Sequence, residues 1–236
     1  MRRARGIRLL ALLAFATGPA FAAQRPVVVQ LFTSLGCSDC PPADALLARI
    51  SDRDPDVLAL DLHVTYWNDA SWADPYSLPG ADRLQSEYAA LRGDSEVYTP
   101  EAVVDGGPPF IGADARAMAA AIARARLTAT AVIPAAIHRA SRQLDITIGA
   151  GTGAGTVWLF GFDPVRRTSV AGGENAGVTV SEVNVVRSIV RLGEWRGRTL
   201  RLRAPRPAGA SFAVILQQAD GTILAAARTS AAAAAS

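Results

Sequence analysis

Hydrophobic and polar residues follow two different patterns along the chain, and the change between them falls near Thr128. In the first half, short apolar runs rich in β-branched residues alternate with stretches whose apolar residues recur every three or four positions. The runs are typical of strands buried in a parallel sheet, and the recurring spacing is typical of amphipathic helices. We expect strands at residues 26–33, 57–64, 101–105 and 109–111, and helices at residues 41–50, 81–91 and 113–126.

The order of these elements, β-α-β-α-β-β-α, indicates parallel strands joined by crossover helices and closed by a terminal hairpin. Beyond Thr128, short apolar segments separated by Gly, Pro and Asp-Gly turns are spaced like the strands of a small sandwich. We expect these strands at residues 130–138, 143–148, 156–162, 178–192, 199–203, 212–218 and 223–227. The sequence therefore predicts an α/β thioredoxin-like domain (24–127), followed by a small all-β sandwich-like domain (128–229) and a disordered tail (230–236).

The N-terminal residues 1–23 contain the three parts of a secretory signal peptide in order. Four arginines precede an apolar run at residues 9–16, and small residues around Ala22 follow it. The run is too short to cross a bilayer, which takes about 18 or more apolar residues, and no later stretch is long enough. We therefore expect export, a periplasmic or secreted location, and no stable membrane insertion after cleavage.

Removal of this segment changes the sign of the chain's charge. All 24 basic residues of the full sequence are arginines, and 21 residues are acidic. Four of the arginines leave with the signal, so 20 remain and the formal net charge falls from +3 to −1. The basic isoelectric point of the precursor is thus no evidence for a nucleic-acid partner, and we expect none.

Cys37 and Cys40 form a Cys-x-x-Cys motif directly after the first expected strand and at the start of the first expected helix. The unpaired N–H groups and partial positive charge of a helix N-terminus stabilise a thiolate. We expect Cys37 to be the exposed nucleophile and Cys40, one turn further on, to resolve a mixed disulfide. Pro41 and Pro42 fit this position because the first-turn N–H groups have no intrahelical acceptor.

Two other interpretations of the motif remain open. A bridge between residues three apart closes a very small loop and restricts the unfolded chain little, but an inert structural disulfide is still consistent with the sequence. His63, which ends the second expected strand, could instead tune the thiols or join them in binding Cu(I), since soft sulfur ligands select that ion. A closed zinc site lacks ligands, because there is no second Cys-x-x-Cys. We assign no metal ligand and predict no cofactor.

Two further segments are candidates for the substrate side of the site. Thr99-Pro100 precedes the third expected strand, where a thioredoxin-like core has a cis proline packed against the redox pair. The loop at residues 66–76 is long and aromatic, and such loops at the carboxyl edge of a sheet often line binding sites. Its tryptophans could equally cover the core. We select Pro100 together with the cysteines, and Thr99, Tyr66 and Trp67 as candidate substrate-binding residues.

Several longer motifs run in order through nearly the whole chain after the signal. They are residues 29–44 (VQLFTSLGCSDCPPAD), 63–67 (HVTYW), 97–100 (VYTP), 103–106 (VVDG), 173–175 (GEN) and 184–187 (NVVR). With these motifs the sequence resembles the domain-of-unknown-function 1223 family, an uncharacterised group of secreted bacterial proteins. The resemblance implies a thioredoxin-like domain with a β-rich extension. The family pattern has Asp where Thr65 stands and Gln where Leu35 stands, so no proton-transfer role is carried over to Thr65.

These observations predict an exported thiol–disulfide oxidoreductase whose partners are thiol- or disulfide-containing proteins. Cys37 and Cys40 would carry the exchange, and Pro100 would shape the substrate face. The alternative is a redox-inert periplasmic binding module or a Cu(I)-handling protein. The direction of electron flow stays open, because it depends on how far the reduced form is stabilised.

Overall fold

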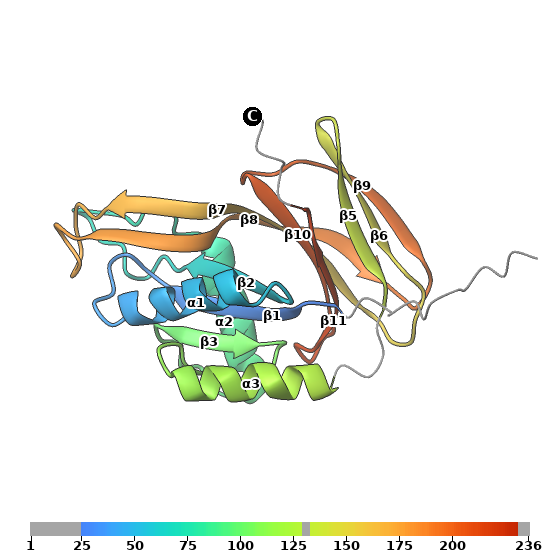
Figure 1. Cartoon of the computed structure of the whole chain (residues 1–236), viewed down its shortest axis with the longest axis horizontal. Helices are drawn as coiled ribbons and strands as arrows, with labels where there is room; N and C mark the ends of the chain where they lie inside the picture. Colours follow the sequence, from blue (N-terminus) through green and yellow to red (C-terminus); the bar gives the residue numbers. More distant parts are fainter. Residues whose placement is uncertain (1–24, 129–132, 231–236) are drawn as a thin grey trace, which may run out of the picture.

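The computed structural model describes residues 25–128 and 133–230 (Figure 1). The predicted signal at residues 1–23 lies outside this part of the chain, and so does the predicted tail apart from Ser230. The helices within it are α1 (Pro41–Arg53), α2 (Pro79–Arg92) and α3 (Ala115–Thr128). The strands within it are β1 (Val27–Thr33), β2 (Val57–His63), β3 (Glu101–Val104), β4 (Phe110–Ile111), β5 (Ala135–Ala140), β6 (Gln143–Ile148), β7 (Gly155–Ser169), β8 (Thr179–Trp195), β9 (Leu200–Pro205), β10 (Ser211–Gln217) and β11 (Ile223–Arg228).

Eight strands form one mixed sheet in the order β11-β10-β7-β8-β2-β1-β3-β4. β1 and β2 pair in parallel over their whole lengths, from Val27 opposite Val57 to Thr33 opposite His63. β8 joins the other edge of β2 in parallel, and β3 runs antiparallel to β1. The sheet therefore contains strands from both halves of the sequence.

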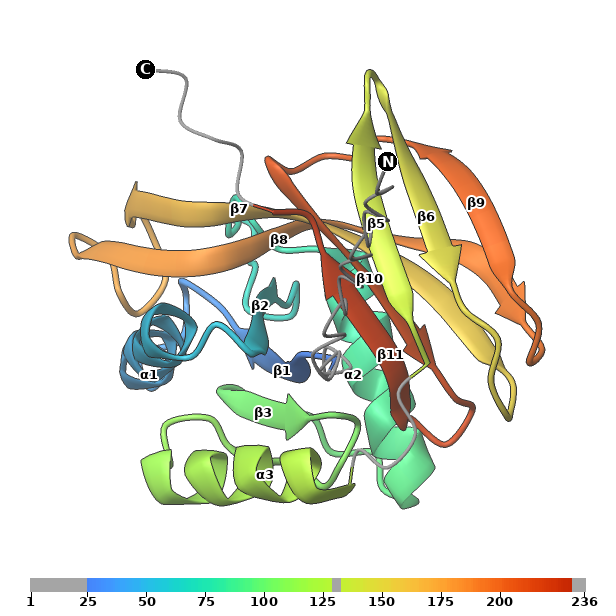
Figure 2. The ribbon, with the colours of Figure 1, turned by 45° about the vertical axis from the view of Figure 1, so that its right-hand side comes forward.

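The predicted fold class, an α/β thioredoxin-like domain followed by a small all-β sandwich-like domain, is therefore wrong. The described part of the protein is mostly β, with 41% of those residues in strands and 20% in helices, and one sheet joins the two parts. The physical reason is the length of β7 and β8, which have 15 and 17 residues. Their hairpin extends past the other late strands and places β8 against the edge of β2 (Figures 1 and 2). The residue boundaries that we predicted for two domains stay a prediction from sequence.

Helices cover both faces of the central strands. α1 and α3 pack on one face, where Leu47 and Met118 join a core cluster with Val29. α2 packs on the other face, where Tyr88 joins a cluster with Phe32. Every residue of β1 and β2 is buried, which explains why both strands are near-continuous apolar runs in the sequence.

A second sheet of three strands, in the order β5-β6-β9, packs against the β7, β10 and β11 end of the large sheet (Figure 2). Trp195 and Ile146 lie in the core cluster between the two sheets, together with Phe212. A two-layer arrangement of strands is thus present at this end of the molecule. One of its layers is the same sheet that carries β1 and β2, so the layers do not form a separate unit.

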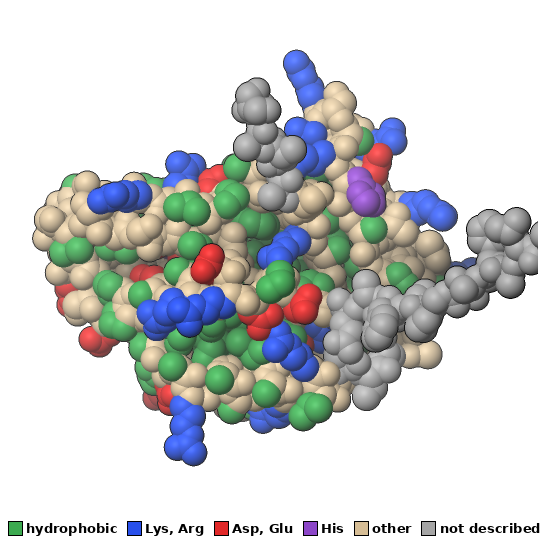
Figure 3. Space-filling view, viewed as in Figure 1, with side chains coloured by type: hydrophobic (Ala, Val, Ile, Leu, Met, Phe, Trp, Pro, Cys, Tyr) green, Lys and Arg blue, Asp and Glu red, His purple; other side chains and the backbone are tan. Residues whose placement is uncertain are grey.

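None of the helices in the described part of the chain is long and apolar enough to span a membrane. On the face shown in Figure 3, arginine and acidic side chains are interspersed rather than gathered by sign. His138 is an exposed histidine of β5, whereas His63 is buried.

Candidate functional site

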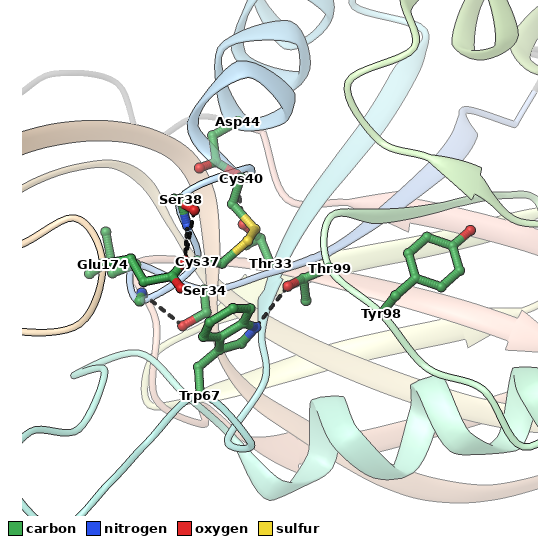
Figure 4. The surroundings of a disulfide bond; sticks show 12 residues. Thr33, Ser34, Cys37, Ser38, Cys40, Asp44, Trp67, Tyr98, Thr99 and Glu174 are labelled. Carbon is green, nitrogen blue, oxygen red and sulfur yellow. Dashed lines mark hydrogen bonds between the residues drawn. A yellow bond between two sulfur atoms is a disulfide. The ribbon is translucent and has the colours of Figure 1, made fainter.

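Cys37 and Cys40 form a disulfide at the N-terminus of α1 (Figure 4). Their Cα atoms are 5.4 Å apart, and Cys40 is the N-cap residue of the helix. The backbone N–H of Cys40 donates to the carbonyl of Cys37 at 3.2 Å, and the N–H of Ala43 donates to the carbonyl of Cys40 at 2.9 Å. The two prolines after Cys40 favour this helix start, since their missing N–H groups would have no acceptor there.

Both cysteines are buried, with exposed fractions of 1% for Cys37 and 0% for Cys40. The prediction that Cys37 is exposed is therefore wrong. Ser38 and Asp39 between them are exposed, whereas the cysteine side chains lie inside. Sequence reasoning missed this burial because the segment that covers the turn is far along the chain.

The covering segment is the loop at residues 170–178 between β7 and β8, which we call the capping loop. Glu174 in this loop accepts hydrogen bonds from the backbone N–H of Ser38 at 3.0 Å and from its hydroxyl at 2.7 Å. The N–H of Glu174 donates to the carbonyl of Gly36 at 3.1 Å. The hydrogen bonds from Ser38 lower the pKa of the Glu174 carboxyl, so it accepts them as a carboxylate at neutral pH.

The next residue of the capping loop, Asn175, is buried and completes the contact. Its Nδ2 donates to the carbonyl of Leu35 at 3.0 Å and to the carbonyl of Cys37 at 2.8 Å. At Gly173 the loop approaches so closely that an added Cβ would lie 2.8 Å from the Cα of Gly36. The capping loop thus binds the backbone on both sides of Cys37.

Of the other predicted site residues, Trp67 and Thr99 lie beside the disulfide (Figure 4). Nε1 of Trp67 donates to Oγ1 of Thr99 at 2.8 Å. The Thr99–Pro100 peptide bond is cis, as we predicted, and Pro100 is buried. Tyr66 is more exposed than Pro100, with an exposed fraction of 45%. Its hydroxyl donates to Oε1 of Gln85 at 3.2 Å. Burial of part of the ring raises the pKa of Tyr66 to about 12.

The aromatic loop at residues 66–76 covers the core. Trp72 packs on a small cluster that contains Leu35 and Val170. The ring of Tyr76 stands edge-on to His63, with ring centroids 5.4 Å apart. Of the two interpretations of this loop, the packing of Trp72 and Tyr76 supports the one in which its aromatic residues cover buried groups.

Asp74, which sequence reasoning missed, ties the strand end before the disulfide to His63. Its Oδ2 accepts hydrogen bonds from the hydroxyl of Ser34 at 3.0 Å and from the N–H of Leu35 at 2.8 Å. The same oxygen lies 2.8 Å from Nδ1 of His63. Burial acts to raise the pKa of Asp74, but its hydrogen bonds, that from His63 first, lower it below the usual value.

His63 also faces two further buried acids, Asp61 of β2 and Glu182 of β8. Burial raises the pKa of Asp61 to about 6. Burial disfavours the charged form of His63, but its contacts with Asp61, Asp74 and Glu182 raise its pKa well above the usual value. The sequence feature that could have revealed this cluster is an acidic residue within an otherwise apolar strand. A buried acid of this kind is normally paired or binds a metal.

The fold and the site together define a class of protein. It has a mixed sheet covered by helices, with a Cys-x-x-Cys disulfide at the N-terminus of the first helix and a long hairpin loop over it. Within that class, the chain belongs to the family described as "Protein of unknown function (DUF1223)", whose model matches residues 28–217. The resemblance found in the sequence is thus confirmed.

Two solved structures are similar to this chain. The crystal structure of Protein AGR_C_4864 from Agrobacterium tumefaciens is 30% identical, with a TM-score of 0.75 over 87% of this chain and 95% of that chain. HBP35 of Porphyromonas gingivalis is 13% identical, with a TM-score of 0.56 over 87% of this chain and 74% of that chain. At that identity the second likeness concerns the fold alone. No curated protein matches the chain.

Proposed function

We propose that the protein is an exported thiol–disulfide oxidoreductase whose partners are thiol- or disulfide-containing proteins. The observation that carries the proposal is the Cys37–Cys40 disulfide at the N-terminus of α1. A bridge between residues three apart removes little entropy from the unfolded chain, because the stabilisation grows with the size of the closed loop. A role in exchange therefore explains the spacing and the position of the pair better than a role in stability.

The helix N-terminus favours a thiolate at Cys37, since its unpaired N–H groups carry a partial positive charge. A partner thiolate attacks Sγ of Cys37, forms a mixed disulfide and displaces Cys40 as a thiolate. A second partner thiolate then attacks the partner sulfur of the mixed disulfide and releases Cys37. Two electrons pass from the partner dithiol to the protein, and the two thiol protons of the partner end on Cys37 and Cys40. The partner becomes a disulfide. The same steps in reverse reduce a partner disulfide.

Burial of both cysteines gives the capping loop a gating role in this proposal. Glu174 and Asn175 must release the cysteine turn before a partner sulfur can reach Cys37. The groups next to the disulfide would then form the partner-binding face. We assign Trp67 and Thr99, which lie beside the disulfide, to that face, together with Pro100, which follows Thr99 through a cis peptide bond, and the exposed Tyr66.

The proposed location is periplasmic or secreted. Support comes from residues 1–23, which have the composition and order of a secretory signal. Disulfides persist in such oxidising compartments and are rare in the cytosol. An exchange reaction at Cys37 and Cys40 is consistent with that environment.

The proposal is tested with two cysteine variants in an insulin-reduction assay and a thiol-oxidation assay. Cys37→Ser should abolish both activities, because it removes the attacked sulfur. Cys40→Ser should accumulate mixed disulfides with partner proteins, because the resolving thiol is missing. The matched control carries Ser169→Cys in a chain that lacks both native cysteines. This thiol on the exposed part of β7 should trap no partners above background.

The reduction potential separates exchange from an inert bridge. The disulfide is equilibrated in glutathione buffers and its free thiols are counted with an alkylating mass tag. A potential between roughly −120 and −270 mV is expected for an exchange catalyst. A value below about −300 mV, or full activity in Cys37→Ser, would overturn the proposal in favour of a redox-inert module.

A further inference from the structure

A cluster of three charged side chains lies where β2 meets β8, outside the proposed exchange site. Asp61, His63 and Glu182 are each 0% exposed. Asp61 and His63 stand two residues apart on β2, so they project from the same face as Ala59, which packs in the cluster with α1. One carboxylate oxygen of each acid and one ring nitrogen of His63 lie within 4.8 Å of one another.

The atoms that face each other in this cluster have no hydrogen-bond partner among the described residues. They are both carboxylate oxygens of Asp61, both of Glu182, and Nε2 of His63. Buried ionised groups without a partner are strongly unfavourable, and proteins pair them or use them to bind metals. The cluster therefore requires additional protons or a cation.

His63 is oriented as a metal ligand would be. Its Nδ1 lies 2.8 Å from Oδ2 of Asp74, which acts as acceptor for a backbone N–H and a hydroxyl as well. Nδ1 therefore carries a hydrogen, and a metal bound at Nε2 would replace the proton on that atom. This atom lies 3.3 Å from Oε1 of Glu182 and 3.9 Å from Oδ2 of Asp61. A carboxylate that holds the other ring nitrogen is the usual outer partner of a metal-binding histidine.

We propose that Asp61, His63 and Glu182 bind one divalent transition-metal cation of the Zn²⁺ type. One imidazole nitrogen and two carboxylate oxygens are donors that Zn²⁺ and Mn²⁺ accept, whereas Ca²⁺ and Mg²⁺ prefer oxygen ligands alone. Ligand atoms about 2.0–2.2 Å from a metal are about 3–3.5 Å from one another. The side chains thus need only small shifts to surround the ion, and its charge offsets the two carboxylates.

The cation would fix the hairpin of β7 and β8 to the central sheet. β2 and β8 share one paired position, Asp61 opposite Val185. A metal held by Asp61 and His63 on one strand and Glu182 on the other adds a second connection at the same place. Binding of the metal therefore stabilises the contact between the two halves of the chain.

The test uses ZnCl₂ alone, with MnCl₂ and CaCl₂ for comparison. Full-length protein with its disulfide intact is unfolded in EDTA, refolded with or without the metal, and desalted. We expect native mass spectrometry of the desalted protein to show one Zn²⁺ per chain. In a separate sample with free metal about 100-fold above Kd, we expect the melting temperature to be higher by about 5–10 °C than in EDTA. Refolded wild type that retains no Zn²⁺ would overturn the proposal and favour a proton shared between His63 and Glu182.

Matched variants locate the bound ion. Glu182→Gln should lose Zn²⁺, while Glu194→Gln, an exposed acid on the same strand, should keep it. His63→Gln should lose the ion and His138→Gln should keep it. Equal Zn²⁺ content in Glu182→Gln and wild type contradicts the assignment. Asp61→Asn provides the same comparison where Glu182→Gln does not fold.

A chain without cysteines separates this site from metal binding by the thiols. The double variant Cys37→Ser and Cys40→Ser should bind Zn²⁺ as the wild type does, because neither sulfur belongs to the donor set. Loss of the ion in this variant would overturn the assignment to Asp61, His63 and Glu182. The insulin and potential measurements are made in EDTA without metal, so the two proposals fail independently.

Discussion

Glu101, the first residue of β3, has a carboxyl group that is completely buried. Nε2 of Gln85 donates to its Oε2 at 2.7 Å, and Nη1 of Arg92 donates to its Oε1 at 3.2 Å. Burial raises the pKa of Glu101 above its usual value in spite of these contacts. The folded protein therefore holds a proton on Glu101 more tightly than the unfolded chain does.

This difference predicts a pH dependence of stability that Glu101→Gln removes. Below the unfolded pKa, about 4.3, Glu101 is protonated in both states. As the pH rises from about 4 through the raised folded pKa, the free energy of unfolding of the wild type falls relative to that of the variant. The slope of this difference is at most about 1.4 kcal/mol per pH unit. Urea unfolding of both proteins between pH 4 and 7 measures it.

The control for this prediction is Glu87→Gln, which removes an exposed carboxylate of α2. It tests whether the burial of Glu101, rather than the loss of one negative charge, causes the change. Wild type and Glu101→Gln with parallel stability curves across this range would contradict the argument.

The sequence predicted some features of the site residues and missed others. The spacing and position of Cys37 and Cys40 indicated a disulfide at a helix start, and Thr99 and Trp67 lie beside it. The burial of Cys37 was missed because the loop that contacts it lies far along the chain, where Asn175, 138 positions away, donates to its carbonyl. A family motif marked that position, but no local pattern gives its contact with the cysteine turn.

At the scale of elements, the capping loop contains two glycines with left-handed backbone angles, and only one of them touches the cysteine turn. Gly173 has φ +71°, and a Cβ there would lie 2.8 Å from the Cα of Gly36. Gly177 has φ +85°, and a Cβ there would meet nothing within 4 Å. Alanine at either position has a similar backbone cost, since side chains disfavour this region. The pair therefore isolates the effect of the contact.

We expect Gly173→Ala to move the capping loop away from the disulfide and to speed its reduction by dithiothreitol about tenfold. The crowding introduced by the added methyl group should destabilise the closed position of the loop by about 1–3 kcal/mol, the cost typical of overpacking. Gly177→Ala should leave the rate within about twofold of wild type. Free thiols counted over time with a mass tag measure the rates. Equal rates for the two variants would show that the capping loop does not limit access to the sulfurs.

The helices follow the sequence pattern closely, whereas β7 continues to Ser169, past the strand end expected at residue 162. The helix expected at residues 41–50 is α1, Pro41–Arg53, and its start is set by two prolines. The helix expected at residues 81–91 is α2, Pro79–Arg92, which ends at Gly93 in the left-handed conformation. These limits were predictable because capping and helical spacing act within a few residues. Strand partners lie far away in sequence, so no comparable local signal exists for them.

At the scale of the whole molecule, the two halves of the chain share one core. Phe32 and Leu60 of the central strands lie in the same buried cluster as Phe160, Val186 and Ile215. The side chain of Arg228 on β11 donates to the backbone carbonyls at the start of β2, at 3.2 and 2.7 Å. Neither half buries its apolar surface without the other.

This shared core predicts that residues 24–127 do not fold alone. The fragment would expose the edge of β2 and the apolar face that β7, β8 and β10 cover. We expect it to lack a cooperative urea transition in far-ultraviolet circular dichroism. The control, residues 24–229, should unfold in one transition that coincides with the change in tryptophan fluorescence. A cooperative transition in the short fragment would contradict the shared core.

The sequence by itself determined the local structure, the cysteine pair at a helix start and the membership of a family, because these depend on residues close together in the chain. Only the tertiary structure decided that one sheet runs through both halves, that the cysteines are covered, and that Asp61, His63 and Glu182 meet. Each of these results depends on where β8 and its hairpin loop pack. That position is set by the burial of apolar surface between distant segments, which leaves no periodic pattern in the sequence.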